Sequence, residues 1–241
     1  MTQASAWRVL LGLALLGMVP AGREAAEART DVRTVALDSI AGLALHGVRA
    51  EAVSHRGRQA VRLVEDPASP ATEPVALIEG SDFGDGTIEL DVAGAPAAGA
   101  PSDARGFIGV AFRSVADGTG FESFYLRPTN GRADDQLRRN HATQYFSAPD
   151  YPWYRLRKET PGVYESYTDL ETGAWTRLRI EVEGVKARLY VNDAPQPCLV
   201  VNDLKRGASR GLIGLWIGNG TEGWFSRLSV RVSPPREPAA R

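Results

Sequence analysis

The chain has 241 residues, with 28 Lys or Arg, 29 Asp or Glu and a formal net charge of −1. This near-neutral balance gives no general electrostatic attraction to nucleic acid or to an anionic membrane. A single cysteine, Cys198, excludes an intramolecular disulfide. A protein of this length must then be stabilised by its core, as one large β-sandwich or as two small domains.

Residues 1–21 have the pattern of a secretory signal peptide. Trp7 and Arg8 precede an apolar run at residues 9–19, and residues 19–21 (Val-Pro-Ala) supply small residues at a cleavage position. The run is shorter than the roughly 20 residues that a membrane-spanning helix needs. We therefore expect an exported protein, in a bacterial periplasm or outside the cell, with no membrane insertion after signal cleavage.

Short segments in which apolar and polar residues alternate follow one another along the rest of the chain. We expect strands, in chain order, at residues 35–40, 60–64, 75–78, 87–92, 107–112, 121–127, 175–183, 185–191, 198–201, 211–217 and 224–232. Such a series predicts an all-β fold. One sandwich domain is expected over residues 33–232, with flexible segments at 22–32 and 233–241 and irregular stretches at 93–105 and 129–143.

The second half of the chain carries two motifs of a known fold. Residues 173–182 (GAWTRLRIEV) and 186–192 (KARLYVN) resemble a hairpin of concanavalin A-like domains, and residues 211–216 (GLIGLW) with 225–228 (FSRL) resemble the ending of these domains. The chain looks similar to the laminin G-like and 3-keto-disaccharide hydrolase (DUF1080) branch of secreted bacterial proteins. The resemblance implies a jelly-roll sandwich of two curved antiparallel sheets, the concave one commonly bearing a carbohydrate site. Because this scaffold hosts lectins, glycosidases and adhesive modules, it does not fix the activity.

Glu89 and Asp91 form the first candidate for chemistry. Two acids at i and i+2 on a strand project to one face. Family 16 glycoside hydrolases on this fold have a similar Glu-x-Asp-x-x-Glu motif, but here the positions for the third acid are Ala93 and Gly94. The carboxylate pair that glycosidic cleavage needs is incomplete, so we expect an exposed polar strand face.

Residues 121–167 are the stronger candidate, because ten aromatic side chains fall in this stretch. Between them, residues 129–143 are polar with one large apolar residue, Leu137, and such insertions between strands are often functional. Sugars stack on aromatic rings and hydrogen-bond to planar polar groups. The candidate ligand-binding residues are Arg127, Asn130, Arg132, Gln136, Arg138, Asn140, Gln144, Tyr145, Trp153 and Tyr154. The same residues also fit a solvated loop pinned by Arg–Asp pairs, with the aromatic rings at the edge of the core.

His141 is the histidine of this stretch, and its pKa lies nearest neutrality among the side chains. With Asp135 as a second proton carrier and Glu165 as a third participant, it could form an acid–base site. It could equally hydrogen-bond a ligand or a loop carbonyl group.

The leading hypothesis is an exported carbohydrate-binding domain that recognises a glycan or glycoside in a cleft on the concave sheet. One alternative is a glycoside hydrolase that resembles the 3-keto-disaccharide hydrolases. A second alternative is a non-catalytic structural or adhesive laminin G-like module.

No cofactor is expected, because the sequence has no His-x-x-His, Cys-x-x-Cys or EF-hand loop. Laminin G-like relatives often hold Ca²⁺, for which the candidate oxygen donors are Asp82, Asp85, Asp117 and Asp134, but no spacing fixes them as a site. The arginines of residues 132–139 are interleaved with aspartates, so they form no nucleic-acid patch. The sequence makes no prediction of oligomeric state.

Overall fold

The computed structural model describes residues 31–234. The expected signal peptide at 1–21 lies outside the described residues, as do residues 22–30 and 235–241. Residues 31 and 32, expected to belong to a flexible segment at 22–32, instead begin strand β1 (Asp31–Val35).

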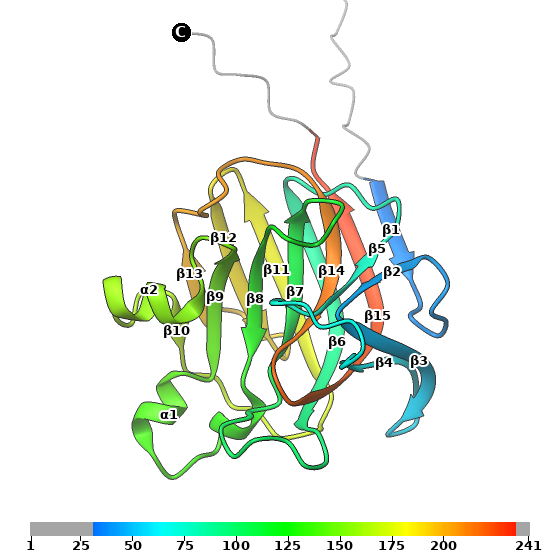
Figure 1. The fold of residues 1–241 in the computed structure, drawn as a ribbon. Helices are drawn as coiled ribbons and strands as arrows, with labels where there is room; N and C mark the ends of the chain where they lie inside the picture. Colours follow the sequence, from blue (N-terminus) through cyan, green and yellow to red (C-terminus); the bar gives the residue numbers. More distant parts are fainter. Residues whose placement is uncertain (1–30, 235–241) are drawn as a thin grey trace, which may run out of the picture.

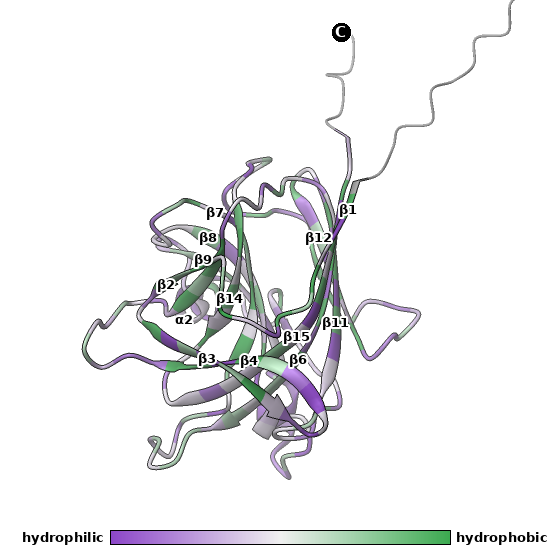
Figure 2. Ribbon diagram, turned by 90° about the vertical axis from the view of Figure 1, so that its right-hand side faces the viewer, coloured by the Kyte–Doolittle hydropathy of each residue, from purple (hydrophilic) through white to green (hydrophobic). Residues whose placement is uncertain are grey.

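Two antiparallel sheets form a sandwich, shown from the front in Figure 1 and edge-on in Figure 2. The front sheet has the spatial order β10 (Glu165–Ser166), β9 (Thr143–Ala148), β8 (Phe121–Leu126), β7 (Ile108–Ser114), β14 (Leu212–Ile217), β5 (Val75–Ile78) and β2 (Leu43–His46). The back sheet has the order β13 (Leu199–Val201), β12 (Lys186–Val191), β11 (Thr176–Glu183), β6 (Gly86–Pro96), β15 (Thr221–Val232), β4 (Arg58–Glu65) and β3 (Val48–His55), and β1 also pairs with β15. The expectation of an all-β, concanavalin A-like jelly-roll sandwich is confirmed.

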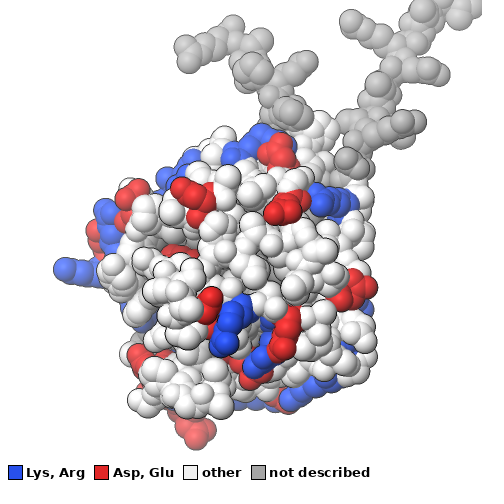
Figure 3. Space-filling view, turned by 45° about the vertical axis from the view of Figure 1, so that its right-hand side comes forward, with Lys and Arg blue, Asp and Glu red and all other residues white. Residues whose placement is uncertain are grey.

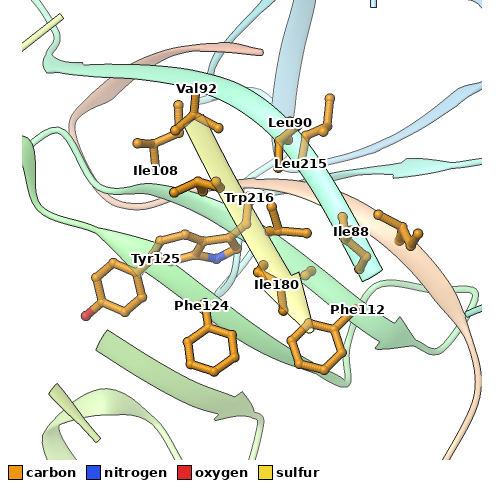
Figure 4. Close-up of a cluster of buried hydrophobic side chains, with 14 of the residues drawn as sticks. Ile88, Leu90, Val92, Ile108, Phe112, Phe124, Tyr125, Ile180, Leu215 and Trp216 are labelled. Carbon is orange, nitrogen blue, oxygen red and sulfur yellow. The ribbon is translucent and has the colours of Figure 1, made fainter. Parts of the chain in front are cut away.

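The core lies between the two sheets, where alternate side chains of each strand meet. Figure 4 labels several of these side chains, among them Ile88 and Leu90 of β6 and Leu215 of β14, and these three are fully buried. Burial of apolar surface of this kind is the main force that stabilises such a sandwich.

Two glycines of the back sheet identify the inner face of the front sheet. A Cβ atom on Gly94 would lie 2.7 Å from Cγ2 of Ile108, and one on Gly223 would lie 2.8 Å from Cγ2 of Ile217. Ile108 and Ile217 therefore point toward the back sheet. Their neighbours along the strands, Gly109 and Trp216, point to the outer face of the front sheet, because side chains alternate along a strand.

The structure adds elements that the alternation of residues did not predict. These are strands β2, β3, β9 and β10, the short helix η1 (Pro128–Asn130), and the helices α1 (Gln136–Asn140) and α2 (Trp153–Glu159). The irregular stretch expected to begin at residue 93 is wrong at its start, because β6 continues to Pro96. The first expected strand, at residues 35–40, is also misplaced: β1 ends at Val35, and Leu37 has a left-handed φ of 59°, outside the extended region of a regular strand.

The helices are short, with three residues in η1, five in α1 and seven in α2. Within residues 31–234, none of them has the length and apolar character that crossing a membrane requires.

Candidate functional site

One row of residues crosses the outer face of the front sheet from β5 to β10. The residues in register across it are Val75, Trp216, Gly109, Tyr125, Gln144 and Glu165. Residues opposite each other on neighbouring strands project to the same face. Since Gly109 has no side chain, the rings of Tyr125 and Trp216 meet above it with their centroids 4.9 Å apart. Phe146 contacts both rings, at 5.7 Å and 5.2 Å, and completes an aromatic floor.

A hollow of about 270 Å³ lies above this floor. Phe107 and Trp153 add aromatic walls to it, and the acidic residues Glu65, Glu73 and Asp103 also line it. Trp153, the first residue of α2, keeps 42% of its surface exposed. Ligand sites typically combine apolar and aromatic walls with a few convergent polar groups in this way, in volumes from about 300 Å³ upward.

Two guanidinium groups flank the ring of Trp153. The Arg127 guanidinium carbon lies 5.7 Å from the ring centroid and that of Arg157 lies 4.8 Å from it, both within range of a cation–π interaction. Arg127 is buried, and this burial lowers the pKa of its side chain. Its Nη1 donates to the His141 carbonyl oxygen at 2.9 Å, which ties the end of β8 to the end of α1.

Gln144 lies fully buried at the centre of this network. Its Oε1 accepts hydrogen bonds from Arg127 Nη2 at 2.8 Å and from Arg157 Nη2 at 3.3 Å, which fixes the orientation of the amide. Its Nε2 is buried without a hydrogen-bond partner among the described residues. An unsatisfied buried donor costs about 1–3 kcal/mol, so this group favours an acceptor oxygen from a water molecule or a ligand.

His141 and Glu165 come together as the sequence suggested. The His141 Nε2 atom lies 3.1 Å from Glu165 Oε1, and Arg157 Nη2 donates to Glu165 Oε2 at 2.7 Å. Burial lowers the pKa of His141, although the Glu165 carboxylate acts in the opposite direction. A neutral imidazole would donate its Nε2 hydrogen to Glu165, an arrangement able to orient both groups for hydrogen bonding or proton transfer.

The third residue of the expected acid–base set, Asp135, lies at the start of α1. Its side chain caps the helix, where Oδ1 accepts from the backbone N–H of Arg138 at 2.7 Å. Asn130 is buried, and its Nδ2 donates to the His141 carbonyl oxygen at 3.2 Å, so it supports the loop that carries His141.

Several expected ligand-binding residues lie on the exposed surface around α1 and do not line the hollow. Arg132 pairs with Asp169 at 2.8 Å, and Gln136 donates to Asn140 at 2.8 Å. Arg138 donates to the Thr129 carbonyl oxygen at 3.4 Å. This is the solvated, internally paired loop that the sequence left open as an alternative.

Tyr145 points into the sandwich, on the opposite face of β9 from Gln144. Its hydroxyl donates to Glu122 Oε2 at 2.6 Å and accepts from the backbone N–H of Lys205 at 2.9 Å. Tyr154 lies outside the aromatic hollow and lines a neighbouring one of about 600 Å³. The two hollows share Thr72 and Glu73 in their walls.

Glu73 and Trp216 are site residues that sequence reasoning missed. Trp216 Nε1 donates to Glu73 Oε2 at 3.0 Å, and burial raises the pKa of Glu73 to about 7. Glu73 follows a turn-rich stretch and belongs to no motif, so nothing in the sequence marked it. With its pKa raised this far, the carboxyl group of Glu73 can carry a proton much nearer to neutral pH than an exposed glutamate. The protonated form can donate a hydrogen bond to a ligand hydroxyl, and the charged form can accept one.

The expectation of an exposed polar face at Glu89 and Asp91 is wrong for Asp91. Asp91 is only 1% exposed, because Arg58 and Arg227 cover its carboxylate. Long side chains from other strands bury Asp91, and the residue pattern of its own strand does not reveal such burial.

The described part of the chain contains no group of three or more His, Cys, Asp or Glu side chains that could hold a metal ion. Of the aspartates considered for calcium, Asp82 pairs with Arg210 at 2.9 Å and Asp85 with Arg113 at 2.9 Å. On the side drawn in Figure 3, Lys and Arg atoms alternate with Asp and Glu atoms, without a broad area of one sign.

Three solved structures resemble the fold. A protein of unknown function with a galectin-like fold from Bacillus subtilis has a TM-score of 0.57 at 11% identity, over 85% of this chain and 96% of that chain. A proposed glycosyl hydrolase from Parabacteroides distasonis has a TM-score of 0.54 at 10% identity, over 83% and 100%. The carbohydrate-binding module CBM66 from Bacillus subtilis has a TM-score of 0.50 at 15% identity, over 77% and 96%. At such identities the likeness shows the fold alone.

No protein-family model matches the sequence, and neither does any curated protein.

Proposed function

We propose that this protein binds a carbohydrate in the hollow over the front sheet. The observation that carries the proposal is the floor of three contacting rings, Tyr125, Phe146 and Trp216, with the half-exposed ring of Trp153 beside it. A sugar ring has apolar C–H faces that pack on such rings and hydroxyl groups at its edge. Glu73 and Asp103 supply acceptors for these hydroxyls at the wall of the same hollow.

The comparisons support this proposal at the level of the fold. One similar structure is a carbohydrate-binding module and another is a proposed glycosyl hydrolase, and both share the sandwich on which this hollow is built. The site itself is argued from the side chains of this chain. Export through residues 1–21 is part of the proposal, and sequencing the N-terminus of protein recovered from a periplasmic fraction would test it.

Binding to a glycan array, followed by titration calorimetry with the best ligand, tests the proposal. Trp153→Ala should weaken binding about tenfold or more, because truncating a central aromatic residue of a binding site typically removes upward of 1–2 kcal/mol. Tyr167→Ala is the matched control, since Tyr167 is 40% exposed and contacts Arg139 instead of the hollow. Absence of binding to any glycan, or equal affinity of the two variants, would contradict the proposal.

A second candidate, glycoside cleavage, is favoured by one observation. A general acid works best with a pKa near the operating pH, and burial gives Glu73 a pKa of about 7 inside the hollow. Cleavage of 3-keto-glycosides that is lost in Glu73→Gln while binding persists would support it. If the wild-type protein binds glycans without product formation, the hollow is a binding site only.

A further inference from the structure

The outer face of the back sheet carries a separate hollow of about 560 Å³. Its lining residues come from β4, β6, β11, β15 and the turns beside them, and they are Arg58, Asp91, Trp175, Arg177, Asn192, Asp193 and Arg227. It contains one member of the acidic pair that the sequence singled out, Asp91. The carbohydrate site proposed above uses none of these residues.

Three guanidinium groups converge on the buried carboxylate of Asp91. Arg58 Nη1 donates to Oδ2 at 2.9 Å, and Arg227 donates to the same oxygen. Arg177 Nη1 lies 3.7 Å from Oδ1. Because the side chain of Asp91 is 2% exposed while those of the three arginines range from 25% to 59%, the carboxylate acts as the base of the cluster and the guanidiniums face the hollow.

Hydrogen-bond donors in this cluster outnumber the acceptors that reach them. Each guanidinium carries five N–H groups. Asp91 accepts from only one nitrogen of Arg58, Nη1, and from two nitrogens of Arg227, Nε and Nη2. The other contacts of Arg177 are long, at 3.5 Å to Glu89 Oε2 and 3.4 Å to the Arg227 carbonyl oxygen. The remaining donors favour an incoming group with several acceptor oxygens.

The unused N–H groups of the arginines favour the same kind of ligand. Asp91 lies beneath them, Glu89 lies 3.5 Å from Arg177 and Asp193 lies at the rim, so the charges of the cluster are balanced and its binding capacity is in its free donors. An oxyanion placed over the guanidiniums would bind through paired N–H groups, as carboxylates and sulfates do with arginine.

The backbone around the hollow is held in an uncommon conformation. Asn192, Asp193 and Arg227 have φ angles of 52°, 56° and 53°. Arg227 lies where the register between β15 and β6 shifts, between Ser226 and Ser229, and this bulge directs its side chain onto Asp91. The left-handed region is ordinary for Asn and Asp in a turn, so Arg227 is the residue at which this conformation is costly.

We propose that this hollow binds an oxyanion, a carboxylate or a sulfate, through Arg58, Arg177 and Arg227. Trp175 forms one wall, with the Arg58 guanidinium 5.3 Å from its ring centroid. The ring thus supports the Arg58 guanidinium beside the anion. Acidic sugars, which carry carboxylate or sulfate groups, are one class of ligand that fits. The inference stands whether or not the front hollow binds a glycan.

Nuclear magnetic resonance titration of the full chain tests the proposal, with sodium sulfate and sodium glucuronate as probes at constant ionic strength. Sodium chloride and glucose are the control titrants. The signals to follow are the Nε–H groups of the three arginines and the indole N–H of Trp175. Saturable shifts with both anions would assign a general oxyanion site, shifts with sulfate alone a tetrahedral-anion site, and shifts with glucuronate alone a site for a carboxylate on a sugar ring.

The double substitution Arg177→Gln with Arg227→Gln should weaken binding about tenfold or more, because it removes two charged donors. Arg188→Gln is the matched control, since Arg188 is an exposed residue of β12 on the same sheet. The amide spectrum of each variant shows whether it is folded. If the double variant does not fold, the single Arg177→Gln variant is titrated in its place. Shifts equal to those in chloride, or undiminished binding in a folded variant, would overturn the proposal.

Discussion

The carboxyl group of Glu73 makes the stability of the protein depend on pH, and it lies at the hollow over the front sheet. Its Oε2 accepts from Trp216 Nε1, which favours the charged form, but burial is the larger effect and raises the pKa to about 7. In the unfolded chain a glutamate titrates near 4.3. The folded state therefore binds more protons than the unfolded state between about pH 4 and pH 7.

The sign of this linkage gives a prediction for the free energy of unfolding. As pH rises from about 4 to 7, the Glu73 contribution destabilises the fold progressively, and above about pH 8 the loss is complete at about 3–4 kcal/mol. Glu73→Gln removes the titration, so the variant should match the wild type near pH 4.5 and exceed its stability at pH 8.5. Urea unfolding at both pH values measures this, with exposed Glu79→Gln as the control. An equal effect of Glu73→Gln at both pH values would contradict the assignment.

At the residue scale, part of the site was predictable from the sequence. Arg127, Gln144 and Trp153 stand in the stretch where aromatic and polar residues are enriched together, and they border the hollow or its network. Glu73 and Trp216 reach the hollow from strands and turns far away in sequence. Only the pairing of β14 with β7 and β5 brings them there, and residue types alone do not encode that register.

At the scale of elements, the aromatic floor depends on how three strands present their side chains. Tyr125 of β8 and Trp216 of β14 are separated by β7, and they meet because Gly109 leaves the space between them open. A Cβ atom at position 109 would lie 2.2 Å from the Phe124 carbonyl oxygen and 2.6 Å from Tyr125 Cβ.

Gly109→Ala should therefore force the strands or rings apart. We expect a loss of about 1–3 kcal/mol in the free energy of unfolding, the usual cost of overpacking, together with weaker ligand binding. Thermal and urea unfolding measure the first effect, and calorimetric titration measures the second. Ser123→Ala, on β8 and two residues from Tyr125 on the same face, is the control: its buried hydroxyl has no hydrogen-bond partner among the described residues, so removing it should lower neither stability nor affinity. A Gly109→Ala protein with wild-type stability would show that the ring contact is not set by this glycine.

Strands were predicted where apolar residues alternate with polar ones, as in β11 with Leu178 and Ile180 inward, or where they form a short apolar run, as in β7. Strand β9 follows neither pattern, because the polar residues Thr143, Gln144 and Ser147 fall on both of its faces. Helix α2 buries only Leu156, so it shows no helical period.

At the scale of the whole molecule, one end of the sandwich is closed by the buried side chain of Arg113. This guanidinium, 0% exposed, donates to the carbonyl oxygens of Gly84, Gly184 and Gly207 at 3.1, 2.8 and 2.5 Å and to Asp85 Oδ1 at 2.9 Å. These acceptors lie in three loops, between β5 and β6, between β11 and β12, and between β13 and β14. Arg113 thus joins connections from both sheets without a disulfide.

Arg113→Met should destabilise the protein by about 3–5 kcal/mol, because it fills the space but removes the donor of three carbonyl groups and leaves the Asp85 carboxylate with only the Gly184 N–H. Arg113→Lys should recover part of the loss, since an ammonium group keeps the charge but lacks the planar set of five donors. Urea unfolding measures both, and exposed Arg188→Met should change stability by less than about 0.5 kcal/mol. If Arg113→Met unfolds at the wild-type urea midpoint, the end of the sandwich is held by strand pairing alone and the three loops are independent of one another.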